Sequence, residues 1–251
     1  MLLSLDTPTE LENLQRKSLR EEIFAVLHHK IIAGKVKAGD WLRQEDIATQ
    51  LGVSMTPVRE ALDLLVSVGL AERVPYRGVR VPQPSAEEIA EAYAMRLLLE
   101  SAGARAAALE REQVRVAASK RILSQMKALV SLDDMSALRQ LSRQFHQSVI
   151  AMGNNAMLDR FYEMAINKFP DWMLYEYLFR HPDALESSLK KEYEEHMALI
   201  EAVEAGDPDQ AEACARTHIY TLKEELVSFL EVEKELLESK ARLFGASFAA
   251  G

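Results

Sequence analysis

Apolar positions in the first third of the chain recur at helical spacing in three short segments. Residues 18–34 open on Ser18, a favoured N-cap residue, and end on Gly34, a favoured residue just after a helix. Residues 43–52 repeat the pattern over a shorter length. Residues 55–69 repeat it with a proline in the first helical turn, where the missing N–H costs nothing. The pattern predicts three helices, with a tight turn between the second and the third.

The period changes from helical spacing to alternation after the third segment. Residues 70–74 and 79–82 alternate apolar and polar side chains, and the PYRG sequence between them is typical of a turn. We therefore predict a two-stranded hairpin. Two helices joined by a short glycine-containing turn and followed by such a hairpin indicate a winged helix-turn-helix, whose second helix fits the major groove of DNA.

Beyond residue 84 nearly every segment has helical spacing. Two prolines in the VPQPS sequence stop regular structure there and mark a domain boundary. We predict helices at residues 86–110, 112–130, 134–152, 155–168, 184–205 and 208–240. An aromatic stretch at residues 169–182 is predicted to connect the fourth of these helices to the fifth. The fold class is thus mainly α, with an N-terminal winged helix-turn-helix followed by an all-helical antiparallel bundle.

The charge of the chain changes sign at the same boundary. The formal net charge of −9 argues against nucleic acid when it is taken alone, but residues 16–84 carry 11 Lys and Arg against 8 Asp and Glu. We expect four parts: an N-terminal extension at 1–15, a DNA-binding domain at 16–84, a helical domain at 85–240 and a C-terminal tail at 241–251.

Short hydroxyls and a long guanidinium gather at the start of the third predicted helix. Ser54, Thr56 and Arg59 are side chains of the types that reach phosphates and base edges. Arg77 adds positive charge to the predicted hairpin, and Gly78 lets the turn approach a backbone closely. Any small helical domain can show the same amphipathic order. Here, however, the turn, the proline, the arginine and the hairpin occur together in the order of a DNA-binding unit.

Three stretches of this region resemble the GntR family of bacterial transcription regulators. They are SLREEIFAVLHHKIIAGKVKAGDWL, LGVSMTPVREAL and RGVRV, and they cover roughly residues 18–81. The resemblance implies DNA contacts by Arg43, Thr56, Arg59, Arg77 and Gly78. Met55 stands where the family usually has an arginine, so one usual contact is absent and the operator sequence can differ from the family's common one.

Three histidines form the most informative pattern of the helical domain. His146, His196 and His218 lie on three different predicted helices, each among apolar side chains, so each imidazole points inward. Three converging neutral imidazoles can bind a divalent cation such as zinc or nickel and leave one position open. Three separate core histidines, each hydrogen-bonded to the backbone, would fit the same spacing, and spacing alone favours that second interpretation.

Three further stretches resemble the FCD effector-binding domain, which follows the winged helix in the FadR subgroup of GntR regulators. They are MRLLLESAGARAAA, SRQFHQSVIAMGN and EEHMALIEAVEAGDPDQAEACARTH, within about residues 86–235. Many members bind a metal through three histidines and an aspartate one helical turn before the first of them. The histidines match, but Ser142 stands at the aspartate position. We expect weakened metal binding, with the open site completed by water, by the effector or by a carboxylate such as Glu192.

Candidate effector contacts follow from the charge such a cavity would hold. A small carboxylate can bind the cation and pair with a guanidinium. Arg96 and Arg143 are predicted to supply that guanidinium, with Tyr93 and Asn167 as further candidates, although either arginine would also fit an ordinary ion pair.

The remaining features bound the setting and the function class. No run of about eighteen uncharged apolar residues occurs, and the N-terminus lacks the basic start of a signal peptide, so we expect a cytoplasmic protein. The single cysteine, Cys214, agrees with a reducing compartment.

We therefore expect a ligand-responsive transcription regulator, a repressor more than an activator, without catalytic residues. It would bind a pseudo-palindromic double-stranded operator as a homodimer. A helical metal-dependent hydrolase could also use three histidines, but no HExxH or comparable motif supplies its general base. A scaffold protein would explain neither the histidines nor the DNA-binding pattern.

Overall fold

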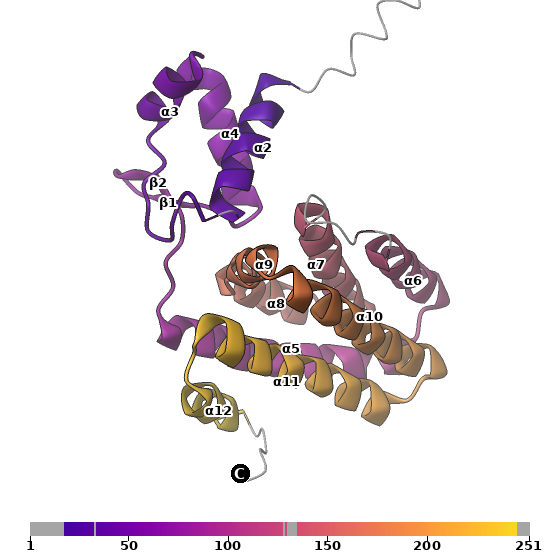
Figure 1. Cartoon of the computed structure of the whole chain (residues 1–251). Helices are drawn as coiled ribbons and strands as arrows, with labels where there is room; N and C mark the ends of the chain where they lie inside the picture. Colours follow the sequence, from indigo (N-terminus) through magenta and orange to yellow (C-terminus); the bar gives the residue numbers. More distant parts are fainter. Residues whose placement is uncertain (1–17, 33, 128, 130–134, 245–251) are drawn as a thin grey trace, which may run out of the picture. The chain divides into compact units, whose positions relative to one another are not determined.

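The computed structural model describes residues 18–244, apart from residues 33, 128 and 130–134. The chain divides into two compact units, residues 1–83 and 84–251, each of which is described by itself (Figure 1). The expected N-terminal extension lies outside the described residues, as does most of the expected C-terminal tail.

The first unit is the predicted winged helix-turn-helix. Its elements are α2 (Leu19–Ile32), α3 (Gln44–Leu51), α4 (Met55–Ser67), β1 (Glu72–Val74) and β2 (Gly78–Arg80). The turn between α3 and α4 is tight because Gly52 is left-handed, with φ 67°, and its N–H bonds back to the carbonyls of Ala48 and Thr49. Ser54 is extended and leads directly into α4.

The wing is an antiparallel hairpin in which Glu72 pairs with Arg80 and Val74 pairs with Gly78. Tyr76 and Gly78 have positive φ values of 61° and 114°, which reverse the chain tightly between the strands. Helix α4 contacts both α2 and α3, and the fully buried apolar residues of this unit include Ile31, Val58, Ala61, Leu65 and Val81.

The second unit is helical throughout its described residues. Its elements are α5 (Ala86–Glu110), α6 (Gln113–Lys127), α7 (Met135–Met152), α8 (Ala156–Lys168), α9 (Asp171–Arg180), α10 (Pro182–Ala205), α11 (Pro208–Leu230) and α12 (Lys234–Arg242). Helix α5 is central, since it contacts α7, α8, α10, α11 and α12, and it runs alongside α11 in Figure 1. Ser85 starts α5 with a capping box, in which it exchanges hydrogen bonds with Glu88.

The aromatic stretch that we predicted to be a connection is a helix instead, α9. Its side chains are buried at helical spacing, with Trp172, Tyr175 and Leu178 among them. The two prolines that flank this ten-residue segment obscured its periodicity in the sequence. Helix α9 matters for function because its first residue, Asp171, lies at the candidate site.

The predicted single helix at 208–240 is also wrong, because it breaks between α11 and α12. Glu231 is left-handed there, with φ 53°, and the N–H of Val232 bonds to the carbonyl of Leu226. Helix α12 contacts α5 and α11. Lys223 on α11 and Glu238 on α12 form a buried ion pair at 3.0 Å across this break.

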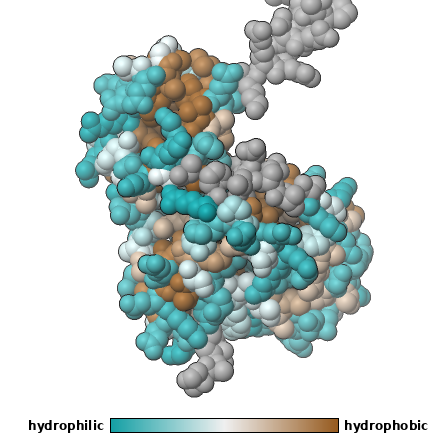
Figure 2. Space-filling model, viewed as in Figure 1, coloured by the Kyte–Doolittle hydropathy of each residue, from teal (hydrophilic) through white to brown (hydrophobic). Residues whose placement is uncertain are grey.

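Within the described residues, no helix has the length and apolar character needed to cross a membrane. Hydrophilic residues cover most of the visible surface of each unit, with smaller hydrophobic areas among them (Figure 2).

Candidate DNA-binding surface and metal site

The start of α4 presents the residues predicted to contact DNA. Ser54, Thr56 and Arg59 are exposed, and the Ser54 hydroxyl does not cap the helix, which leaves it available to a ligand. Gln44 at the start of α3 donates from Nε2 to the carbonyl of Met55 at 2.8 Å. This bond ties the start of α3 to the start of α4, and nothing in the sequence pattern had indicated it.

The remaining predicted contacts lie at the start of α3 and on the wing. Arg43 is the exposed residue that precedes α3. The Arg77 guanidinium lies 5.1 Å from the centre of the Trp41 ring, which orients it by a cation–π contact. A Cβ added at Gly78 would lie 3.9 Å from the same ring, so space is available there, but its φ of 114° disfavours any other residue.

Two other arginines on the wing are engaged by acids. Arg80 pairs with Glu72 at 2.6 Å, and Arg73 pairs with Asp63. Tyr76 at the tip of the wing is fully exposed, and sequence reasoning had not singled it out.

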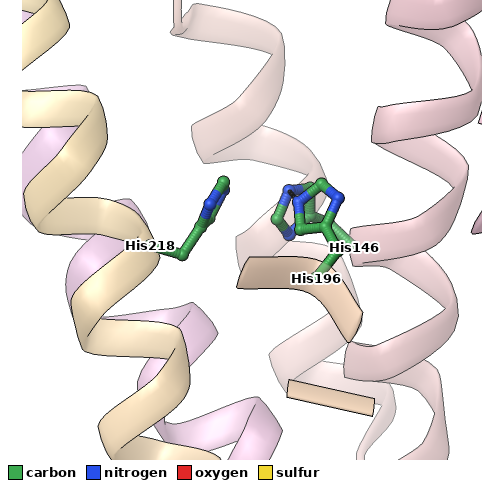
Figure 3. Close-up of side chains that lie close together, drawn as sticks. All are labelled: His146, His196 and His218. Carbon is green, nitrogen blue, oxygen red and sulfur yellow. Dashed lines mark hydrogen bonds between the residues drawn. The ribbon is translucent and has the colours of Figure 1, made fainter. Parts of the chain in front are cut away.

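The three predicted histidines form one buried cluster. They come from α7, α10 and α11, and Figure 3 shows their rings projecting into the same space. One nitrogen from each of His146, His196 and His218 lies within 4.8 Å of the other two. The Nε2 atoms of His146 and His196 are 3.1 Å apart. The alternative of three separate histidines bonded to the backbone does not fit these contacts.

Buried carboxylates orient two of the histidines. The Nδ1 atom of His146 lies 2.9 Å from Glu100 Oε2, and the Nδ1 atom of His218 lies 2.9 Å from Glu195 Oε2. A neutral imidazole that donates from Nδ1 has its lone pair on Nε2, which is the arrangement around metal-ligating histidines. The cluster therefore directs lone pairs inward, as a bound cation requires.

Burial keeps two of the histidines, His146 and His196, in the neutral form that can bind a metal. It lowers the pKa of His146, although Glu100 partly offsets the effect, and it lowers the pKa of His196 well below its ordinary value, helped by His218 and His146. Burial alone would raise the pKa of Glu100, but Arg96 and His146 bring it below its ordinary value. Two neutral histidines, His146 and His196, are thus held close to an ionised carboxylate.

Ser142, the departure from the aspartate pattern, donates its hydroxyl to Glu192 Oε1 at 2.7 Å. Both residues line the same cavity as His146 and His218. The Glu192 carboxylate is not a member of the tight histidine cluster, whose ligand atoms come from the three histidines alone among the described residues. Glu192 therefore lines the cavity without joining the histidine cluster.

This cavity has a volume of about 70 Å³, which is space for a small molecule. Arg96 and Arg143, two of the predicted effector contacts, both line it. Arg96 is buried, donates to Glu100 Oε1 at 2.6 Å and lies over the Phe169 ring. Of the predicted effector contacts, these two arginines reach the cavity.

The other two predicted effector contacts lie outside the described lining of the cavity. Tyr93 is fully buried, and its pKa is raised by burial and by its neighbours Tyr220 and Glu238. Asn167 accepts a long hydrogen bond of 3.5 Å from Arg143. Asn167 is thus placed to orient an arginine of the cavity, whereas Tyr93 belongs to the apolar core of the helical unit.

Sequence reasoning missed several polar residues of the cavity. Arg139 donates to Asp171 Oδ1 at 2.6 Å, and Arg143 donates to Asp171 Oδ2 at 3.0 Å. Glu225 accepts from Ser188 at 2.6 Å. On helices these residue types resemble a solvated face, and for Arg139 the only available signal was its position one turn before Arg143.

Comparison with known proteins gives the family. The family model for bacterial regulatory proteins of the gntR family matches residues 19–81, and the FCD domain model matches residues 91–221. A probable D-xylose utilization operon transcriptional repressor of Paenarthrobacter nicotinovorans is 30% identical over 213 residues, covering 83% of this chain and 88% of the relative. The gluconate operon transcriptional repressor of Bacillus subtilis is 31% identical over 60% of this chain and 61% of its own length.

A solved structure shows the same fold. Escherichia coli McbR/YncC is 24% identical, with a TM-score of 0.57, over 82% of this chain and 95% of that chain. The matching families and relatives are transcriptional regulators, which excludes the hydrolase alternative. This chain therefore belongs to the GntR family of bacterial regulatory proteins, carries an FCD domain after its winged helix-turn-helix, and is a transcriptional regulator rather than an enzyme.

Proposed function

We propose that this regulator is a cytoplasmic, ligand-responsive repressor that binds its operator as a homodimer and takes a small carboxylate at a divalent metal. One observation carries the proposal: three histidines converge, two of them line a cavity that arginines also line, and the chain has a winged helix-turn-helix. A bound cation, the guanidinium groups and an enclosed cavity would together suit a small anionic ligand.

The metal would be held by His146, His196 and His218, with zinc or nickel as the expected ion. It would supply positive charge at the cavity wall, which attracts a carboxylate. Glu100 and Glu195 would keep two of the imidazoles correctly oriented through their Nδ1 atoms. FCD domains are commonly associated with metals, which supports this assignment.

The effector carboxylate would be bound by the metal together with Arg96 and Arg143. The two arginines line the same cavity as His146 and His218. Arg139 is added to this set, because it is buried and lines the cavity as well.

The DNA contacts would be made from the start of α3, the start of α4 and the wing. The proposed residues are Arg43, Ser54, Thr56, Arg59, Arg77 and Gly78. Their support is exposure together with chemistry that suits phosphates and base edges. The D-xylose and gluconate relatives are named as repressors, which favours repression over activation.

The dimer would use an exposed apolar face of α8. Met157, Phe161 and Met164 lie on one side of this helix and are 56%, 47% and 66% exposed. Such a stripe is costly in water and is typical of a surface that another protein covers. A second copy is the expected occupant, because two DNA-binding units related by a twofold axis read the two halves of a pseudo-palindrome.

Native mass spectrometry of the purified full chain tests the proposal as a whole. We expect a dimer with one metal ion per chain, which a chelator removes, and mass added by a small carboxylate that is retained only while the metal is present. A monomer with neither metal nor retained ligand would contradict it.

A further inference from the structure

The cavity that would take the effector is lined by charges of both signs. Its positively charged side chains are Arg96, Arg139 and Arg143. Its acidic side chains are Asp171, Glu192, Glu195 and Glu225. The charge that a ligand must carry depends on which of these side chains already have an ion-pair partner.

The arginines are largely neutralised by neighbouring acids. Arg96 pairs with Glu100 at 2.6 Å, while Arg139 and Arg143 share Asp171 at 2.6 and 3.0 Å. Three guanidinium groups therefore face two carboxylates. The Arg139 side chain is only 7% exposed, and its Nε atom is buried without a hydrogen-bond partner among the described residues. This end of the cavity can still accept one anionic group.

Two carboxylates of the cavity have only hydroxyl partners. Ser142 donates to Glu192 at 2.7 Å, and Ser188 donates to Glu225 at 2.6 Å. In the described part of the chain neither acid has an ion-pair partner within 4.0 Å. Two part-buried acids that lack an ion-pair partner are therefore gathered at this end of the cavity, and leaving such groups unpaired costs free energy.

A second metal ion does not account for these acids. Within the described residues, the group of ligand atoms close enough to hold an ion is the histidine cluster, and neither Glu192 nor Glu225 belongs to it. An organic cation fits better, because an ammonium group can donate hydrogen bonds to two carboxylates and to a serine hydroxyl. Unlike a metal ion, it does not need these acceptors packed tightly around one point.

We infer that the effector is zwitterionic, of the amino-acid class, with its carboxylate toward the arginines and histidines and its ammonium group toward Glu192 and Glu225. The inference rests on the proposed function for the carboxylate end and adds the second charge. A hydroxy acid would also find acceptors at these two residues, but it would leave their negative charge uncompensated.

Matched pairs of ligands separate the two classes. Calorimetry on the zinc-loaded full chain, freed of excess metal, would compare alanine with lactate, aspartate with malate, and glutamate with 2-hydroxyglutarate. Each pair differs only by an amino group in place of a hydroxyl. We expect at least one amino acid to bind roughly tenfold or more tightly than its hydroxy partner, since a charge-assisted hydrogen bond replaces a neutral one.

Two variants test whether the preference for an amino acid depends on Glu225 and Glu192. Glu225→Gln should erase most of the difference between the amino acid and its hydroxy partner. The control Glu186→Gln makes the same change at an exposed position of α10 and should keep the difference. Circular dichroism would check that both variants are folded, and Glu192→Gln provides an independent second test if Glu225→Gln is not.

The outcomes also separate this inference from the proposed function. If hydroxy acids bind as tightly as amino acids, or if the preference survives both Glu225→Gln and Glu192→Gln, the effector is not recognised through an ammonium group and the inference is wrong, while the carboxylate site stands. If no acid of either class binds, the proposed carboxylate site fails as well.

Discussion

At the scale of single residues, Ser142 is the position that bears most on the proposed metal site. It stands where an aspartate would add an anionic ligand, and its hydroxyl bonds Glu192 instead. A cation held by the nearby histidines would then lack a carboxylate ligand in that position. We therefore expect a weaker site whose vacant coordination position is open to a ligand from the cavity.

Replacing Ser142 tests this arrangement directly. Ser142→Asp should tighten zinc binding by roughly tenfold or more, because a carboxylate joins the coordination sphere, and it should destabilise the metal-free protein, because it faces Glu192 with like charge. Ser142→Asn, which has a similar shape but no charge, is the control. Zinc calorimetry on chelator-stripped protein measures both. Equal zinc affinity in all three proteins would place Ser142 outside the coordination sphere.

Arg59 carries the corresponding test on the DNA-binding unit. Arg59→Ala should weaken operator binding by about 1–3 kcal/mol while the helices remain folded, since the side chain is exposed at the start of α4. Gel shifts at matched salt measure the change, and Arg20→Ala, an exposed substitution on α2, is a control for loss of charge. Unchanged affinity would remove Arg59 from the interface.

Histidine burial predicts a dependence of stability on pH. Burial holds the pKa of His196 well below the ordinary value of about 6.5, so the unfolded chain takes up a proton before the folded protein does. The stabilisation is complete above pH ~6.5 and is lost as the pH falls toward the lower pKa of the folded state. Urea unfolding of metal-free protein between pH 7 and 5 should show this loss, and His196→Gln should show less of it. An identical loss in both proteins would contradict the assignment.

At the scale of secondary-structure elements, periodicity predicted most helices but not their interruptions. The wing, the helix-turn-helix and α5 were predicted because each has caps or turn residues at its ends. Helix α9 was missed because aromatic side chains and flanking prolines look like a connection. The break after α11 was missed because Glu231, a good helix former, takes the left-handed conformation to let α12 contact α5.

The same contrast holds for the candidate site. The histidines were predictable because a polar residue on an apolar helix face is conspicuous. Arg139 and Glu225 were not, because charged residues on helices usually face solvent, and only the packing of α7, α9, α10 and α11 encloses them around one cavity.

Helix α8 carries the test of the proposed dimer. Phe161→Glu should shift the equilibrium toward the monomer by roughly tenfold or more, because it buries a charge in the middle of the apolar stripe. Glu163→Lys on an exposed position of the same helix is the control and should leave the dimer intact. Sedimentation velocity over a range of concentrations measures the result. A Phe161→Glu protein that remains as dimeric as the wild type would place the interface elsewhere.

At the scale of the whole molecule, a regulator must couple its two units energetically. A ligand alters DNA affinity only if it binds one DNA-binding state better than the other, and the coupling is the same in both directions. Typical couplings change affinity by about 5–150-fold. The histidine cluster and its cavity are the described features of the helical unit best suited to sense a ligand.

The most direct test is the operator affinity of the metal-loaded and chelator-stripped full chain, measured side by side with His196→Gln. Metal removal should change the operator affinity of the wild type by at least about fivefold, and it should leave the affinity of His196→Gln unchanged, because that variant has lost a ligand of the proposed site. Folding of each sample would be checked by circular dichroism. If the wild type binds the operator equally well with and without metal, the histidine cluster does not control DNA binding and the account of a metal-dependent, ligand-responsive regulator is contradicted.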